Sequence, residues 1–129
     1  MNRDKKPKVS HADLAAIVEE IMEDANGIDE VFAAFEAVLE DESELPCAGR
    51  VIGEAVSLIA WEYDGNELVG LRARCRRSDG NEYLVSAWEV ELGEEAAGAL
   101  VLAAYRLWLG VKIPRKTKAA IRPKRNVKP

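Results

Sequence analysis

The tetrapeptide DGNE occurs twice in close succession, beginning at Asp64 and again at Asp79. An Asp-Gly pair between segments that can form strands is a strong signal for a β-hairpin, because Gly takes positive φ without steric cost and Asp tolerates it. Tight turns at these two places predict three antiparallel strands joined in a meander.

These turns fix which residues would pair. The first sets Leu58 opposite Leu71, and the second sets Cys75 opposite Leu84. Apolar and polar side chains then separate onto two faces. The predicted buried face collects Val56, Leu58, Ala60, Val69, Leu71, Ala73, Cys75, Leu84, Trp88 and Val90, and the other face collects Arg72, Arg74, Arg76, Tyr83, Val85 and Ala87. We therefore expect Leu71 and Trp88 to be neighbours in the core, with the three arginines on the opposite side.

Helices are predicted on both sides of these strands. The first, over about residues 10–26, has Ser10 as its N-cap and Asp13 at the capping-box position. The second covers about 28–43, and the third covers about 94–109 and stops at Gly110. The inward-facing stripes are Leu14, Ile17, Val18, Ile21 and Met22 in the first, Val31, Phe32, Phe35, Val38 and Leu39 in the second, and Leu100, Val101, Ala104, Tyr105 and Trp108 in the third.

Strands are expected over about residues 49–92, beginning with a strand from Gly49 to Ala55 that has Gly53 as a bend or bulge. The whole pattern predicts one α+β domain over residues 9–111. Its parts are an N-terminal helical hairpin, a small antiparallel meander and a C-terminal helix.

Charge divides the chain into three parts. Residues 9–111 contain no Lys, and six arginines against 22 acidic residues leave this body at −16. Residues 1–8 form a basic tail of +3, and residues 112–129 form a basic tail of +8, which gives the net charge of −5. The second tail contains prolines and little to bury, so we expect it to be disordered.

The C-terminal tail is a candidate polyanion-binding segment, because its cations would release counterions from phosphates. These cations are Lys112, Arg115, Lys116, Lys118, Arg122, Lys124, Arg125 and Lys128. Nucleic acid or an acidic protein is the corresponding partner. The alternatives are that the tail folds back on the acidic body or only keeps the protein soluble.

An acidic run ends the predicted second helix, where carboxylates oppose the helix dipole. Solvent, a nearby Arg or a bound cation could offset this repulsion. Carboxylates at this helix end and at the two turns are hard oxygen donors of the kind that Ca²⁺ takes. The candidate calcium ligands are Glu40, Asp41, Glu42, Glu44, Asp64, Glu67, Asp79 and Glu82. Neither turn is an EF-hand loop, because the Gly directly follows the Asp. A joint site would require the helix end and the turns to converge in space.

Several function classes find little support in the sequence. One histidine, His11, and two distant cysteines, Cys47 and Cys75, cannot build a zinc site within the chain. There is no P-loop and no nucleophile elbow, so we do not expect an enzyme. No apolar run approaches a membrane span, and the cysteine usage fits a cytoplasmic protein with free thiols.

The order of parts also carries a resemblance. The stretches that match are Asp24-Ala25 through the second helix, Glu40–Pro46, Val51–Val56, Ala73–Arg77 and Ala104–Trp108. This order resembles a family of small bacterial cytosolic proteins typified by a cyanobacterial calcium-binding protein. The resemblance spans roughly Asp24 to Trp108 and implies an SH3-like β-barrel packed on helices, together with calcium binding as a buffer or sensor. Family members are richer in acidic residues at the start of the second helix, where this chain has Asp29 and Glu30.

Overall fold

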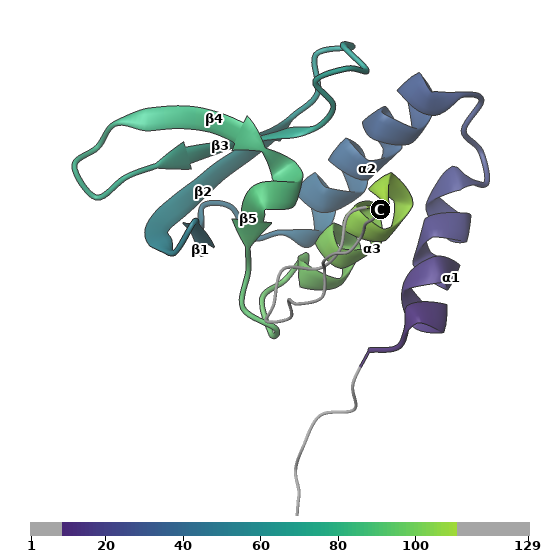
Figure 1. Cartoon of the computed structure of the whole chain (residues 1–129), viewed down its shortest axis with the longest axis horizontal. Helices are drawn as coiled ribbons and strands as arrows, with labels where there is room; N and C mark the ends of the chain where they lie inside the picture. The colour runs from purple at the N-terminus through teal and green to yellow at the C-terminus, as the bar shows by residue number, and fades with distance from the viewer. Residues whose placement is uncertain (1–8, 111–129) are drawn as a thin grey trace, which may run out of the picture.

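Helices α2 and α3 lie against a five-stranded antiparallel sheet in the computed structural model, which describes residues 9–110 (Figure 1). The elements are α1 (His11–Met22), α2 (Ile28–Glu42), β1 (Cys47–Val51), β2 (Glu54–Glu62), β3 (Arg72–Arg76), β4 (Glu82–Ser86), the 3-10 turn η1 (Ala87–Glu89), β5 (Val90–Glu91) and α3 (Ala99–Leu109). The α+β class predicted from the sequence is confirmed.

The strands follow the order β4-β3-β2-β1-β5. Within the described residues, the outermost strands β4 and β5 do not pair with each other, so the sheet is open and a closed barrel is not confirmed. β1 and β2 are joined by a hairpin turn at Ile52 and Gly53, both of which have positive φ. Two such residues are what a type I′ turn requires. The chain therefore changes direction at Gly53 as predicted, but the prediction of one strand over residues 49–55 is wrong, because the turn separates two strands.

A β-bulge in β2 changes the register predicted from the first DGNE copy. Leu58 pairs with Cys75 and Ala60 pairs with Arg74, so the bulge inserts one extra residue, Ile59, into β2. The predicted pairing of Leu58 with Leu71 is wrong. Because a bulge reverses the alternation of side chains, both Leu58 and Trp61 are buried although they are three residues apart.

The first DGNE copy forms a loop rather than a tight hairpin turn. Asp64 accepts a hydrogen bond from the N–H of Asn66, and the carbonyl of Asn66 accepts from Val69 and Gly70. Asp is favoured in such local turns because its side chain bonds the backbone two residues on. Residues 63–71 therefore form an extended loop between β2 and β3. Val69 in this loop is exposed, whereas it was predicted to be buried.

The second DGNE copy does turn between two strands, but one residue out of the predicted register. The N–H of Arg77 bonds the carbonyl of Asn81, and Cys75 pairs with Tyr83, not Leu84. Tyr83 and Val85 therefore pack against the core, opposite to their predicted face.

The one-residue change of register between β3 and β4 continues into η1. Ala87 is buried and donates its N–H to the carbonyl of Leu71, whereas Trp88 is 39% exposed. The predicted core pairing of Leu71 with Trp88 is wrong. The prediction for Arg72, Arg74 and Arg76 is confirmed, since none of the three lies in the core.

Several helix ends follow their sequence signals, but α1 ends at Met22 instead of near residue 26, and Met22, predicted to face inward, is 39% exposed. Ser10 and Asp13 form the predicted capping box at the start of α1. Gly110 caps α3 in the left-handed conformation, as predicted for its stop. The start of α3 is wrong by five residues, because the helix begins after Gly98 at φ 90°. Leu100, predicted to face inward, is 47% exposed.

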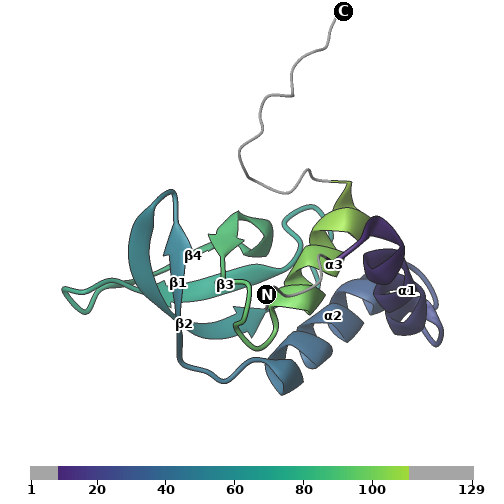
Figure 2. The same ribbon diagram turned by 90° about the horizontal axis from the view of Figure 1, so that it is seen from below.

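The helices pack in a different order from the one expected. α1 packs mainly on α3, and a separate α1–α2 hairpin is not confirmed. Figure 2 shows α1 on the side of α3 away from the sheet. No helix within residues 9–110 combines the length and the hydrophobicity that a membrane span requires.

Besides the buried bond from Arg106 in α3 to the carbonyl of Val90 in β5, two buried hydrogen bonds join the helical layer to the sheet side of the core. The hydroxyl of Tyr105 in α3 accepts from the N–H of Leu71 at 3.2 Å. The indole N–H of Trp61 in β2 donates to the Ser43 hydroxyl at the end of α2 at 3.1 Å. Around them, Phe35 packs edge-on against Tyr105 with ring centroids 5.3 Å apart. The core therefore lies between the sheet and the α2–α3 layer.

Leu71→Ala should lower the free energy of unfolding by about 2–5 kcal/mol, because the side chain is fully buried and its removal leaves a cavity. Leu68→Ala is the matched control, since Leu68 in the same loop is 98% exposed and should change stability by less than about 0.5 kcal/mol. Urea denaturation of both variants measures the difference. Equal effects of the two substitutions would contradict this assignment of the core.

Candidate metal site

The acidic run at the end of α2 stands free in solvent. Glu40, Asp41, Glu42 and Glu44 are all exposed, and within the described residues none of them forms a side-chain hydrogen bond or an ion pair. The helix ends at Ser43, whose buried hydroxyl is held by the Trp61 indole. This bond fixes the last turn of α2 against the sheet and leaves the four carboxylates pointing outward.

The charge of Glu44 reaches the neighbouring strand. Burial raises the pKa of the Cys47 thiol, and the nearby carboxylate of Glu44 raises it further. Cys47 is therefore a neutral thiol at the edge of the acidic run, and it adds no negative charge there.

The carboxylates near the turns differ from the acidic run, because arginines form ion pairs with several carboxylates of the turns and of the neighbouring strands. These arginines belong to β3 and to the turn that follows it. The pairs are Arg72 with Asp64 (3.1 Å), Arg74 with Glu62 (2.6 Å), Arg76 with Glu82 (2.9 Å) and Arg77 with Glu54 (3.0 Å). Two of the eight predicted ligands, Asp64 and Glu82, are thus already neutralised by a guanidinium group.

The two remaining turn carboxylates form no ion pair within the described residues, although Asp79 lies near the Arg77–Glu54 pair. Asp79 accepts hydrogen bonds from the backbone N–H and the side-chain amide of Asn81, at 2.9 and 3.1 Å. Glu67 is exposed and lies near the hydroxyl of Tyr63. Each of them offers one carboxylate to a cation.

The other two described arginines bind backbone carbonyls. Arg50 donates to Gly53, and Arg106 is buried and donates to Trp88 and Val90. Burial lowers the pKa of Arg106 from its ordinary value. Since the remaining four arginines pair with other carboxylates, no arginine within residues 9–110 forms an ion pair at the end of α2.

An acidic group at the start of α2 was not among the predicted ligands. Tyr63 directly follows β2. Its hydroxyl group donates a hydrogen bond to Asp29, and its backbone N–H donates one to Glu36 at 3.0 Å. Its ring stacks on Phe32 with centroids 5.0 Å apart. Partial burial raises the pKa of Tyr63, and the hydrogen bond to Asp29 and the nearby Glu67 and Asp64 raise it further. The sequence signal was the Asp29–Glu30 pair at the start of the helix.

The predicted ligands do not come together. α2 has 15 residues and therefore spans roughly 22 Å at the usual rise per residue. Asp64 and Glu67 lie near its start, through Tyr63 and Asp29, whereas the acidic run lies at its end. Within residues 9–110, no three acidic, histidine or cysteine side chains gather closely enough to hold a metal ion. A calcium ion would have to assemble its ligands from separate, solvated positions.

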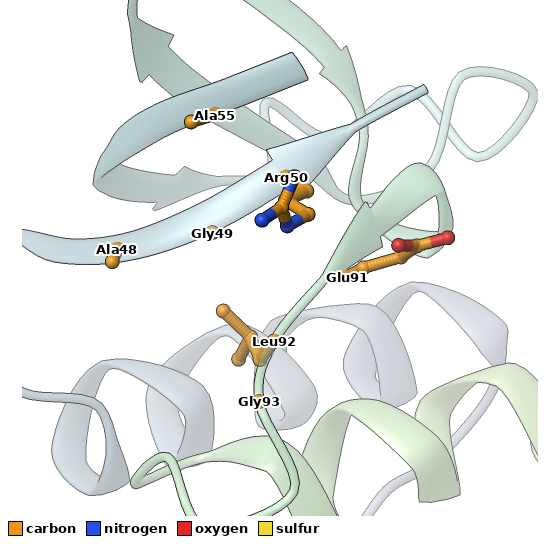
Figure 3. A pocket seen from close by; sticks show the side chains of 7 residues that line it. All are labelled: Ala48, Gly49, Arg50, Ala55, Glu91, Leu92 and Gly93. Carbon is orange, nitrogen blue, oxygen red and sulfur yellow. The ribbon is translucent and has the colours of Figure 1, made fainter. Parts of the chain in front are cut away.

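A shallow groove opens between β1 and the end of β5 (Figure 3). It is lined by Ala48, Gly49, Arg50, Ala55, Glu91, Leu92 and Gly93. Glu91 is the one acidic residue of this lining, and Figure 3 shows its carboxylate pointing away from the guanidinium group of Arg50. The donors in this groove do not suit a divalent cation.

Two solved structures share this fold. The crystal structure of Anabaena CcbP matches with a TM-score of 0.61 at 17% sequence identity, over 75% of this chain and 94% of that chain. A calcium binding protein in the calcium-binding form matches with a TM-score of 0.61 at 19% identity, over 77% of this chain and 92% of that chain. No family model matches the sequence, and no curated protein matches it significantly. The fold implied by the resemblance to the cyanobacterial protein is confirmed in its overall arrangement.

Asp29→Asn should lower the pKa of Tyr63, because a neutral amide no longer opposes the phenolate. In the unmodified protein the folded state holds this proton longer than the unfolded chain does, so the associated stability is present at neutral pH and is lost as the pH rises above about 10. Phenolate absorbance during an alkaline titration measures the shift, with Tyr63→Phe to identify the residue.

Glu30→Gln is the matched control, since Glu30 accepts from the N–H of Asn26 and does not bond Tyr63. It should leave the titration unchanged. An alkaline titration that is the same in Asp29→Asn and in the unmodified protein would show that Asp29 does not contact Tyr63 in solution.

Proposed function

We propose that this chain binds Ca²⁺ through the carboxylates at the C-terminal end of α2. The observation that carries the proposal is the distribution of the six arginines of the acidic body. Four of them pair with carboxylates of the sheet and its turns, and two bind backbone carbonyls. Within the described residues, Glu40, Asp41, Glu42 and Glu44 are left without a cation. The likeness in fold to proteins described as calcium-binding supports the choice of ion.

The electrostatics of the helix end favour a divalent cation. Four carboxylates within five residues repel one another, and the negative end of the helix dipole adds to this repulsion. The last carbonyl groups of a helix lack intrahelical donors, so they are further oxygen ligands close by. Ca²⁺ accepts six to eight such oxygens in irregular geometry, whereas Mg²⁺ requires a near-ideal octahedron and gives up its water reluctantly.

The turns are poorer sites for the same ion. The guanidinium groups of Arg72 beside Asp64, and of Arg76 beside Glu82, would repel Ca²⁺ as well as compete with it for oxygen atoms. Of the eight carboxylates predicted from the sequence, we therefore propose the four at the end of α2 as the Ca²⁺ ligands. Ordering four exposed side chains around an ion costs conformational entropy, so we expect weaker binding than at a preformed site.

The position of the acidic run is compatible with either a calcium sensor or a calcium buffer. Ser43 lies inside it and is tied to the buried Trp61, so a sensor would transmit a change at the run to the core through this bond. A buffer would bind without moving it. The alternative function, binding of nucleic acid or an acidic protein by the cations of residues 112–129, falls outside the described residues and stays a prediction.

Ca²⁺ should raise the thermal midpoint at matched ionic strength, because the folded helix end sets these carboxylates beside the free carbonyl groups of its last turn, which the unfolded chain does not. Mg²⁺ should raise it less, because it gives up its water reluctantly. Asp41→Asn together with Glu44→Gln should remove most of the Ca²⁺ effect. The same double variant should be more stable without Ca²⁺, since part of the repulsion is gone. Thermal melts and calorimetric titration measure both effects.

Asp64→Asn together with Glu82→Gln is the matched control. It removes the same charge from carboxylates that arginines already neutralise, so the response to Ca²⁺ should persist. The proposal would be contradicted if Ca²⁺ and Mg²⁺ raised the thermal midpoint equally and neither double variant changed these shifts. The protein would then have an acidic surface and no calcium site.

A further inference from the structure

β4 forms one edge of the sheet. It pairs with β3 on one side and with no described strand on the other (Figure 1). The hydrogen bonds flanking β4 show which of its backbone groups remain free. The N–H of Arg77 bonds the carbonyl of Asn81, and the N–H of Ala87 bonds the carbonyl of Leu71.

In an antiparallel ladder, hydrogen-bonded pairs alternate with non-hydrogen-bonded pairs. The pairs between those two ends that exchange hydrogen bonds are therefore Ala73 with Val85 and Cys75 with Tyr83. The N–H and C=O groups of the alternate residues Glu82, Leu84 and Ser86 point away from β3, toward the free edge.

This edge lacks the usual devices that prevent strands from pairing. Edge strands are commonly blunted by Lys, Pro, a bulge or an inward-pointing charge. β4 reads Glu82-Tyr83-Leu84-Val85-Ser86 and is regular throughout its pairing with β3. Its one charge, Glu82, is already paired with Arg76 at 2.9 Å and lies 3.9 Å from Arg74. The opposite edge, β5, has only two residues.

We propose that β4 pairs antiparallel with β4 of a second copy of this chain, about a two-fold axis at Leu84. In this register Leu84 lies opposite Leu84 of the second copy, and Glu82 lies opposite Ser86 of the second copy. Every outward N–H and C=O of the three residues then has a partner. The two open sheets become one continuous sheet.

The side chains suit this register on both faces. Tyr83 meets Val85 of the second copy on the core side, and aromatic residues paired with β-branched residues across strands are stabilising. On the outer side the two Leu84 side chains meet at the axis. No like charges stand directly opposite each other, so this self-complementary pairing carries no cross-strand charge repulsion.

The long-range repulsion between two acidic bodies is reduced at this edge. The arginine–carboxylate pairs neutralise the surface around β3 and β4, whereas the free carboxylates at the end of α2 precede β1, on the other side of the sheet. The chain's own basic tail is a poorer occupant, because the carboxylates in and beside β4, such as Glu82 and Glu54, are already paired with arginines and offer its cations little. The charge pattern therefore favours a second copy over the tail.

Sedimentation equilibrium of the full chain tests the proposal. Pairing of two short strands buries a small interface, so the dimer should be weak, and the measurement should run from about 10 µM to about 1 mM. The average mass should rise with concentration from 14.2 kDa toward twice that value. Leu84→Lys places like charges opposite each other at the axis and should keep the mass at the monomer value. Ala37→Lys, the same charge change at an exposed position of α2, should dimerise like the unmodified chain.

Amide hydrogen exchange identifies the interface. The amides of Glu82, Leu84 and Ser86 should become protected only at high concentration, whereas those of Tyr83 and Val85 should be protected at every concentration. Leu84→Pro adds a variant that removes an outward N–H which β3 does not use, and it should also stay monomeric. Circular dichroism checks that both Leu84 variants are folded.

Three outcomes would overturn the proposal. The first is a monomer at every concentration, and the second is a dimer in which the three outward amides stay unprotected. The third is protection of those amides at low concentration that disappears when residues 112–129 are removed, which would place the chain's own tail on the edge.

Discussion

The bulge at Ile59 in β2 is the constraint on which the rest of the structure depends. It inserts one residue between Leu58 and Ala60, and the reversed alternation turns Trp61 into the core. From there the indole holds Ser43, which fixes where α2 ends and where its acidic run stands relative to the sheet. Without the extra residue, Trp61 would face solvent on the outer side of the sheet. The position of the proposed calcium site thus follows from a single residue inserted in a strand.

The second constraint is the supply of cations. The acidic body has a net charge of −16 and no lysine, so the positions of its six arginines decide which carboxylates are neutralised. β3 contributes three of them on alternate residues, and its partners carry the matching carboxylates. This arrangement neutralises one part of the surface and leaves another part strongly acidic. The neutral part includes the free edge of β4, where a second copy can approach, and the acidic part is where a divalent cation can bind. One distribution of charge therefore supports both proposals.

The sequence was most informative where a signal is local. Ser10 and Asp13 gave the start of α1, Gly110 gave the end of α3, and the alternation in β3 placed its arginines outside the core. The failures came from signals with two structural meanings. Asp-Gly suits a tight hairpin turn, and in both copies the Asp side chain bonds the backbone two residues on, but only in the first does the Asn66 carbonyl begin a further turn that makes a loop. Nothing local marks Ile59 as a bulge. The sequence also could not show which candidate ligands form ion pairs. The pairing of Asp64 with Arg72 depends on the register that the bulge sets between β2 and β3. The contact of Asp29 with Tyr63 joins residues that are distant in sequence.

The central claim is that the end of α2, and not the turns, offers its carboxylates to calcium. The most direct measurement is a Ca²⁺ titration followed by the backbone amide resonances of the folded chain. The account predicts saturable shifts for residues 40–44 and the adjoining residues, with those of residues 64–67 and 79–82 nearly unchanged. Saturable shifts at the two turns without any at the end of α2, or no saturable shift at all, would contradict it.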